Sequence, residues 1–197
     1  MAPSSTSTSK SATVYFGYGS NLWQHQMVQR CPTSQYLGVA RLNDFQWIIN
    51  ERGYANVVEV NTTDVKPVAY EHEVWGMVYT LKPKDEKNLD RNEGVPVAYT
   101  KEMLLCDYWP AGKHGANISS TPEKTEMLVY INRNQTRADK PKHEYIYRMN
   151  MGIADALNEG VPKPYVDKVM RKFIPEVASK EVEELAKRQA LEFEDER

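Results

Sequence analysis

The chain has 197 residues, of which 41% are hydrophobic and 26% charged, a composition typical of one globular domain with a core of its own. A formal net charge of -2 argues against a surface for nucleic acid or for an anionic membrane. No apolar run reaches the roughly 18 residues that would span a bilayer, so we expect partners other than nucleic acid and membranes.

The cysteines and histidines form no pattern for a metal site. Cys31 and Cys106 lie far apart, neither belongs to a CxxC or CxxH motif, and the four histidines are scattered. We expect two reduced cysteines that pack as small side chains in a cytoplasmic protein, and no bound metal.

Three segments are expected along the chain. Residues 1–12 are rich in Ser and Thr but lack the apolar stretch of a signal peptide and the arginines of a transit peptide, so we expect a disordered leader. One domain follows over residues 13–175. Residues 176–197 are strongly charged and are expected to form a solvated helix that ends in an acidic tail.

The domain opens with residues 14–22, a β-branched and aromatic run that predicts a buried strand. The run breaks at Gly19, and Ser20 and Asn21 are typical N-cap residues for a helix over residues 22–28. Backbone N–H groups at such a strand-to-helix turn can hold a small anion. The same residues also suit a plain tight turn, and the local sequence leaves both interpretations open.

Short β-rich runs and helical periodicity predict the remaining elements. Strands are expected over residues 36–42, 45–50, 55–60, 74–79, 99–109 and 126–132, the first two joined by a hairpin-like turn at Asn43 and Asp44. Helices are expected over residues 83–93, 145–159 and 165–173, and loops over residues 61–72 and 110–122. Gly76, inside a strand, indicates close approach of another backbone or a ligand. Strands that precede helices without βαβ alternation favour an α+β fold with a mainly antiparallel or closed sheet.

One carboxylate stands out in the helix expected to start at Pro83. Leu89 is its only apolar side chain apart from the proline, so Leu89 marks the buried face, and Glu93 follows four residues later on that face. Asp85, Glu86 and Asp90 are expected to point toward solvent. Burial and the negative end of the helix dipole would both raise the pKa of Glu93, as a general base that later acts as an acid requires. The alternative is an exposed residue at the helix end, or a structural partner for an arginine.

Several motifs together resemble the γ-glutamylcyclotransferases. They are Tyr18-Gly19-Ser20-Asn21-Leu22, the run Val-Trp-Gly-Met-Val-Tyr at 74–79, Asn-Leu-Asp-Arg-Asn-Glu-Gly-Val at 88–95, and the C-terminal segments at 145–152 and 160–165. The resemblance covers roughly residues 14–173. It implies a small mixed, mainly antiparallel β-barrel flanked by helices, and an enzyme that converts a γ-glutamyl amine into 5-oxoproline and the free amine without a cofactor.

The resemblance also assigns roles to residues. It implies that the residues of the first motif, Tyr18, Gly19, Ser20, Asn21 and Leu22, hold the glutamyl group. By the same resemblance Glu93 is the acid and base, and Tyr99 and Tyr145 line the cavity. The substrate's own α-amino group would be the nucleophile, which closes a five-membered ring on the γ-carbonyl.

Two other functions remain open at this point. The same chemistry could act on a glutathione conjugate of secondary metabolism or on γ-glutamyl-ε-lysine, and intact glutathione is the less expected substrate. A member of another class would be a non-catalytic protein that keeps the cavity and binds a metabolite or a protein partner. A homodimer is one possible assembly. Ser20 is not expected to be a nucleophile, because the GxSxG elbow is absent.

Overall fold

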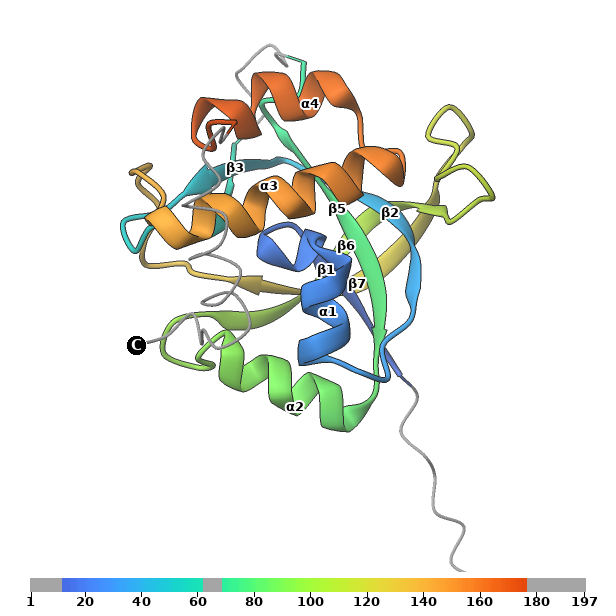
Figure 1. Ribbon diagram of the computed structural model, residues 1–197, viewed down its shortest axis with the longest axis horizontal. Coiled ribbons are helices and arrows are strands. Elements are labelled where there is room, and N and C mark those ends of the chain that lie inside the picture. The colour runs from blue at the N-terminus through green and yellow to red at the C-terminus, as the bar shows by residue number, and fades with distance from the viewer. Residues whose placement is uncertain (1–11, 62–68, 177–197) are drawn as a thin grey trace, which may run out of the picture.

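The computed structural model describes residues 12–61 and 69–176. Its strands are β1 (Thr13–Gly17), β2 (Tyr36–Asn43), β3 (Phe45–Ile49), β4 (Ala55–Glu59), β5 (Glu73–Leu81), β6 (Thr100–Pro110) and β7 (Glu123–Ile131). Its α-helices are α1 (Gln24–Arg30), α2 (Pro83–Asn92), α3 (His143–Asn158) and α4 (Lys163–Lys168), and short 3-10 helices lie at η1 (Ser20–Leu22) and η2 (Met170–Lys172). In the view of Figure 1, α1 lies between α3 above it and α2 below it, and α4 lies at the top.

Five strands close into a barrel in the order β1-β5-β2-β6-β7, and β3 and β4 form a separate two-stranded sheet. Neighbours in the barrel are antiparallel except β1 and β7, which are parallel where Tyr15 pairs with Leu128. Phe16, Met77 and Met127 are among its fully buried side chains. The prediction of an α+β fold with a small mixed, mainly antiparallel barrel and flanking helices is confirmed.

Gly76 lies where β5 passes closest to β1. A Cβ atom at this position would lie 2.5 Å from the Gly17 carbonyl oxygen and 2.7 Å from the Phe16 ring. Backbone cannot give way as a flexible side chain can, so only glycine fits here. The predicted close approach of another backbone is therefore confirmed.

The strands β2 and β3 are both present, but the expected hairpin between them is wrong. β2 pairs with β5 and β6 inside the barrel, whereas β3 pairs with β4, with Trp47 opposite Val57. Asp44, between β2 and β3, has a left-handed φ of 64°. Its turn redirects the chain out of the barrel, because pairing within the barrel satisfies both edges of β2.

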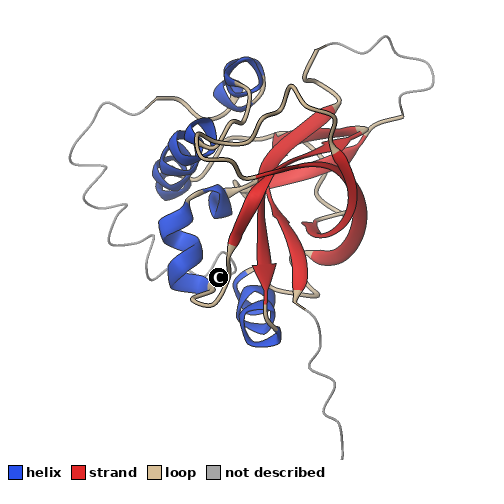
Figure 2. Ribbon diagram, turned by 90° about the vertical axis from the view of Figure 1, so that its right-hand side faces the viewer, coloured by secondary structure: helices blue, strands red, loops and turns tan. Residues whose placement is uncertain are grey.

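The α-helices lie along one side of the barrel and at its lower end (Figure 2). On α3 the side chains of Met149, Ile153 and Ala156 are fully buried. A Cβ atom at Gly152 would lie 2.8 Å from the Cβ of Leu22, so this glycine lets α3 pack closely on η1. The helix thereby supports the turn that follows β1.

Ser20 and Asn21 do not cap α1, contrary to the prediction. Both lie inside η1, and Trp23 occupies the N-cap position. The backbone N–H of Gln24 instead donates to the Asp155 carboxylate of α3 at 2.9 Å. Because a neighbouring helix caps α1, the side chains of Ser20 and Asn21 are left for other contacts.

Asp85 was expected to face solvent, and this is also wrong. Its side chain is buried and accepts hydrogen bonds from the Thr33 N–H at 3.1 Å and from the Thr33 hydroxyl at 2.6 Å. The reason is simple helix geometry: Asp85 precedes Leu89 by four residues, so it shares the buried face of α2.

The expected leader over residues 1–12 and the charged segment over residues 176–197 lie almost wholly outside the described residues, as does the middle of the loop over residues 61–72. Along the described part of the chain, no helix is both long and apolar enough to cross a membrane. The homodimer and the cytoplasmic location stay predictions.

A buried carboxylate, Asp107 on β6, joins three strands. It accepts hydrogen bonds from the Arg41 guanidinium at 2.8 Å and the Asn43 amide at 2.8 Å, and forms an ion pair with Lys124. Burial alone would raise the pKa of Asp107, but these donors outweigh it and lower the pKa to about 2.

We expect Asp107→Asn to lower the free energy of unfolding at pH 7 by about 1–3 kcal/mol, because an amide loses the charge that these donors stabilise. A depressed folded-state pKa contributes stability above the unfolded value of about 3.9, which is lost as the pH falls toward about 2. Urea unfolding at several pH values should show the difference between wild type and variant shrinking over that range. A difference independent of pH would contradict the electrostatic explanation.

Candidate active site

The turn after β1 holds two buried polar side chains, Ser20 and Asn21. The turn is closed by hydrogen bonds from the Leu22 N–H to the Gly19 carbonyl at 2.9 Å and from the Trp23 N–H to the Ser20 carbonyl at 3.0 Å. This tight 3-10 geometry turns the polar side chains inward, between the barrel and α3.

Gln26 on α1 fixes the side chains of both Ser20 and Asn21. Its amide nitrogen donates to the Ser20 Oγ at 3.0 Å and to the Asn21 Oδ1 at 2.9 Å. The Asn21 side-chain oxygen is thereby occupied as an acceptor of the Gln26 amide, so the Asn21 amide nitrogen points away from Gln26. That nitrogen donates to the Tyr15 hydroxyl at 2.9 Å and to Oε1 of Glu93 at 3.0 Å.

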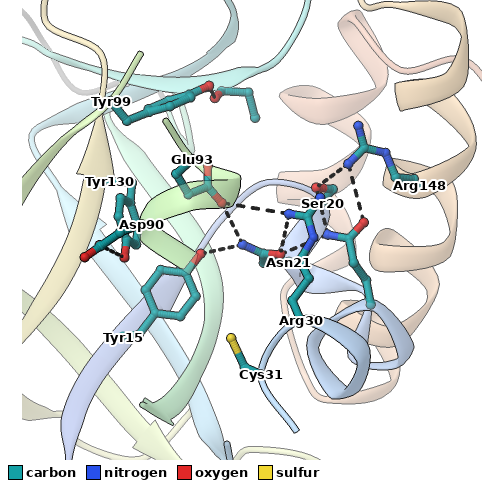
Figure 3. A network of polar contacts seen from close by, with 12 residues as sticks. Tyr15, Ser20, Asn21, Arg30, Cys31, Asp90, Glu93, Tyr99, Tyr130 and Arg148 are labelled. Atoms are coloured by element: carbon teal, nitrogen blue, oxygen red, sulfur yellow. Dashed lines mark hydrogen bonds and ion pairs between the residues drawn. The ribbon is translucent and has the colours of Figure 1, made fainter. Parts of the chain in front are cut away.

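Glu93 ends α2 and points inward, as its spacing from Leu89 predicted. Its N–H donates to the Leu89 carbonyl at 2.8 Å, and its side chain is only 11% exposed. Gly94 follows with a left-handed φ of 60° and lets the chain leave the helix at once. Figure 3 shows the Glu93 carboxylate and the Asn21 amide directed toward each other.

Arg30, at the C-terminal end of α1, brings a positive charge to this carboxylate. One guanidinium nitrogen lies 4.0 Å from Oε1 of Glu93 and donates to the Asn21 Oδ1 at 3.3 Å. The Asn21 amide and the Arg30 charge both favour the ionised carboxylate, whereas burial opposes it. Glu93 is therefore both an inward-pointing carboxylate and a partner for an arginine, two features that the sequence analysis gave as alternatives.

Tyr145 reaches the turn from the start of α3. Its hydroxyl oxygen accepts hydrogen bonds from the Ser20 N–H at 3.1 Å and from the Ala55 N–H of β4 at 3.3 Å. One of the backbone donors that the sequence suggested for an anion is therefore held by a phenol oxygen. Tyr145 thus links the turn after β1 to the separate sheet.

Tyr99 and Tyr18 are positioned by backbone carbonyls. The Tyr99 hydroxyl donates to the Ala55 carbonyl at 2.9 Å, and the Tyr18 hydroxyl donates to the Tyr130 carbonyl at 2.5 Å. Figure 3 places Tyr99 on the opposite side of Glu93 from Tyr15.

These side chains surround a small enclosed cavity of about 30 Å³. It is lined by Tyr15, Tyr18, Gly19, Ser20, Asn21, Tyr54, Ala55, Glu93, Tyr99, Tyr130 and Tyr145. Of the residues singled out from the sequence, all lie here except Leu22, which is fully buried against α3 instead. One water occupies roughly 10–15 Å³ of cavity volume on this scale, so the cavity has room for only a few waters. A glutamyl group, which is larger, would enter only if lining side chains move.

Four lining residues were missed from the sequence: Tyr15, Tyr54, Ala55 and Tyr130. A signal did exist for Tyr15, which lies in β1 three residues before Tyr18, the first residue of the motif that follows this strand. Tyr54 and Tyr130 come from distant segments, and only the barrel closure and the separate sheet bring them here.

Three tyrosines of the cavity, Tyr15, Tyr18 and Tyr130, have a raised pKa and stay protonated near neutral pH. Burial raises the pKa of Tyr15 well above its ordinary value, and the neighbouring Glu93 carboxylate raises it further. Burial likewise raises the pKa of Tyr18 and Tyr130. The Tyr18 hydroxyl already donates to the Tyr130 carbonyl, and the Tyr130 hydroxyl donates to the Asp90 carboxylate. The Tyr15 hydroxyl accepts from the Asn21 amide, so its own proton can be donated to a ligand.

Arg148 of α3 places a fully buried guanidinium directly behind the turn. It lies 5.1 Å from the centre of the Tyr145 ring and donates long hydrogen bonds to the Ser20 Oγ at 3.4 Å and to the Gln26 Oε1 at 3.5 Å. With Arg30 it gives the wall formed by the turn a positive potential, which favours a negatively charged ligand group there.

Among the residues that the structure describes, no group of three or more His, Cys, Asp or Glu side chains could hold a metal ion. Cys31 and Cys106 are both buried and free, and burial raises the pKa of each thiol to about 12. Both thiols are therefore inert packing groups.

Comparison with known proteins shows the family to which this chain belongs. Residues 73–169 match the model of the AIG2-like family. A γ-glutamylcyclotransferase from Mus musculus is 32% identical over 163 residues, which cover 79% of this chain and 76% of the relative. The chain belongs to the γ-glutamylcyclotransferase family.

Further relatives of the γ-glutamylcyclotransferase family extend over the same region. A γ-glutamylcyclotransferase from Homo sapiens is 26% identical over 165 residues, which cover 83% of this chain and 80% of that protein. A solved structure of a γ-glutamyl cyclotransferase has a TM-score of 0.64 and 22% identity, covers 90% of this chain and 99% of that chain, and shares the fold.

Gly19 of this γ-glutamylcyclotransferase family member offers a direct test of the turn. A Cβ atom there would lie 2.8 Å from the Tyr145 hydroxyl and 3.2 Å from the Ala55 Cβ. We expect Gly19→Val to raise KM for a γ-glutamyl substrate by at least ~10-fold, with a smaller effect on folding, because it displaces the tyrosine and narrows the cavity.

The control is Ala111→Val, which introduces the same branched side chain at an exposed position just after β6. Steady-state kinetics together with thermal unfolding measure both effects. An unchanged KM in a folded Gly19→Val protein would show that the turn does not touch the substrate.

Proposed function

We propose that this protein is a γ-glutamylcyclotransferase that converts a γ-glutamyl amino acid or peptide into 5-oxoproline and the free amine. Family membership supports the reaction class, and the geometry supports the assignment of roles. The single observation that carries the proposal is the Glu93 carboxylate, which is buried, lines the cavity and accepts a hydrogen bond from Asn21 of the Gly19-Ser20-Asn21 turn.

In the proposed mechanism, Glu93 first removes a proton from the substrate's α-ammonium group. The freed amine then attacks the γ-carbonyl carbon, which forms the new ring bond and an oxyanion. When the tetrahedral intermediate collapses, the bond to the leaving nitrogen breaks, and Glu93 returns a proton to that nitrogen. After the attack the new ring nitrogen gives up a second proton, which also passes to the leaving amine, so this amine departs as an ammonium group, charge is conserved and no water is consumed.

The surroundings of Glu93 suit both halves of this cycle. The Asn21 amide and Arg30 stabilise the carboxylate before it accepts the proton, and burial makes the neutral acid accessible afterwards. Ring closure is already intramolecular, so the protein mainly has to select the folded-back conformer and move protons.

The wall formed by the Ser20 and Asn21 turn suits the charged end of the substrate. Arg148 and Arg30 make this turn electropositive, and the neutral Tyr15 hydroxyl offers a further donor. We assign the substrate's α-carboxylate or the reaction oxyanion to this wall.

The substrate test compares three γ-glutamyl compounds at equal concentration: γ-glutamyl-alanine, glutathione and γ-glutamyl-ε-lysine. We expect 5-oxoproline from γ-glutamyl-alanine at the highest rate and from glutathione at a lower rate. A reversed order would change the leaving group but keep the chemistry. If none of them yielded 5-oxoproline while the folded protein bound this product, the protein would be a binding module and not an enzyme.

A further inference from the structure

A second hollow of about 310 Å³ opens beside the cavity. We call it the outer hollow. It is lined by Arg52, Gly94, Val97, Ala98, Asn132, Asn134 and Gln135. None of these residues has a role in the mechanism above.

The outer hollow shares its wall with the cavity. Gly94 directly follows Glu93, and Ala98 directly precedes Tyr99, so one short loop serves both spaces. The Arg52 guanidinium lies 5.7 Å from the centre of the Tyr54 ring and 5.8 Å from the centre of the Tyr99 ring. Arg52 therefore lies at the boundary between the two.

The far wall of the outer hollow is held in place by a buried side chain, Asn56 of β4. Its amide nitrogen donates to the carbonyls of Asn132 at 2.8 Å and Gln135 at 3.1 Å, and its oxygen accepts from the Asn132 N–H at 3.0 Å. The Asn132 side chain in turn accepts from the N–H groups of Asn134 and Gln135, both at 2.9 Å. This wall is thus formed without a ligand.

The chemistry of the lining points to an anionic ligand with a small apolar part. Arg52 supplies a cation, Asn132, Asn134 and Gln135 supply amide groups, and no carboxylate is among the lining residues. Val97 and Ala98 add an apolar surface. An arginine with neighbouring amides suits a carboxylate, which it can bind in a bidentate manner.

We propose that the outer hollow binds the leaving amine, and that Arg52 selects leaving groups with a free carboxylate, as amino acids and peptides have. This inference rests on the proposed function. If Glu93 returns a proton to the leaving nitrogen, that nitrogen lies within hydrogen-bond reach of its carboxylate. The glutamyl part then occupies the cavity, whose lining side chains move to admit it, and the rest of the substrate extends past Gly94 into the outer hollow.

Two matched substrates test this assignment, γ-glutamyl-alanine and γ-glutamyl-alaninamide, which differ only in the carboxylate. We expect the wild type to prefer γ-glutamyl-alanine by at least ~10-fold in kcat/KM. Arg52→Met should lose about that factor on γ-glutamyl-alanine and change little on the amide, and Arg52→Lys should keep part of the preference. Arg137→Met is the control, since Arg137 is a largely exposed arginine that pairs with Glu51.

The outcomes distinguish failure of the leaving-group assignment from failure of the proposed function. If Arg52 only packed on the tyrosine rings, Arg52→Met would slow both substrates equally, and the leaving-group assignment would be wrong. Equal turnover of both substrates by the wild type would overturn it as well, while the proposed function would stand. If the wild type produced 5-oxoproline from neither, the proposed function would fail and the assignment with it.

Discussion

Glu93→Gln is expected to lower kcat on γ-glutamyl-alanine by at least ~100-fold while the protein stays folded. The amide keeps the volume of the side chain, and its oxygen can still accept the hydrogen bond from Asn21. It cannot take a proton from the substrate's α-ammonium group, so the nucleophile stays protonated and inert. The loss should therefore appear mainly in kcat and less in KM.

The control is Glu126→Gln, an equal change of charge at an exposed position of β7. Circular dichroism and thermal unfolding of both variants establish that the fold is kept. Near-normal turnover by folded Glu93→Gln would show that another group moves the protons, and Glu93 would then be only the structural partner of Arg30.

N-acetyl-γ-glutamyl-alanine is expected to give no detectable product, which is the largest substrate effect of the proposed mechanism. Acetylation turns the α-amine into an amide, which has no basic lone pair for ring closure. The α-linked isomer, glutamyl-alanine, is expected to be inert as well, because only a γ-amide places its carbonyl at five-ring distance from the amine.

Inhibition separates loss of chemistry from loss of binding. The N-acetyl compound is tested as a competitive inhibitor of γ-glutamyl-alanine turnover, and mass spectrometry detects any product formed from either compound. Turnover of the N-acetyl compound at a rate near that of γ-glutamyl-alanine would contradict intramolecular cyclisation, since no nucleophile for it would remain.

Helical periodicity predicted that Glu93 lies on the buried face of α2, and the family resemblance assigned it to the cavity. Leu89 marked the buried face of α2, and the spacing of four residues carried Glu93 to the same side. The same rule should have placed Asp85 on that face, four residues before Leu89. The prediction placed Asp85 toward solvent, whereas its side chain is buried and one carboxylate oxygen accepts two hydrogen bonds from Thr33.

Contacts between distant segments could not be predicted in the same way. Ser20 and Asn21 have the local preference of helix caps, but Asp155 of α3 caps α1 in their place. The pairing of β3 with β4 rather than with β2 also depends on closure of the barrel, which no local turn signal encodes. The cavity residues Tyr54 and Tyr130 were missed for this reason.

The measurement that tests the central claim most directly is product analysis of γ-glutamyl-alanine turnover in water enriched in oxygen-18. Intramolecular attack by the α-amine consumes no water, so we predict equal amounts of alanine and 5-oxoproline, with no oxygen-18 in either. Glutamate that carries one oxygen-18 atom would show hydrolysis by water instead, and would contradict the cyclisation that we assign to Glu93 and the Gly19-Ser20-Asn21 turn.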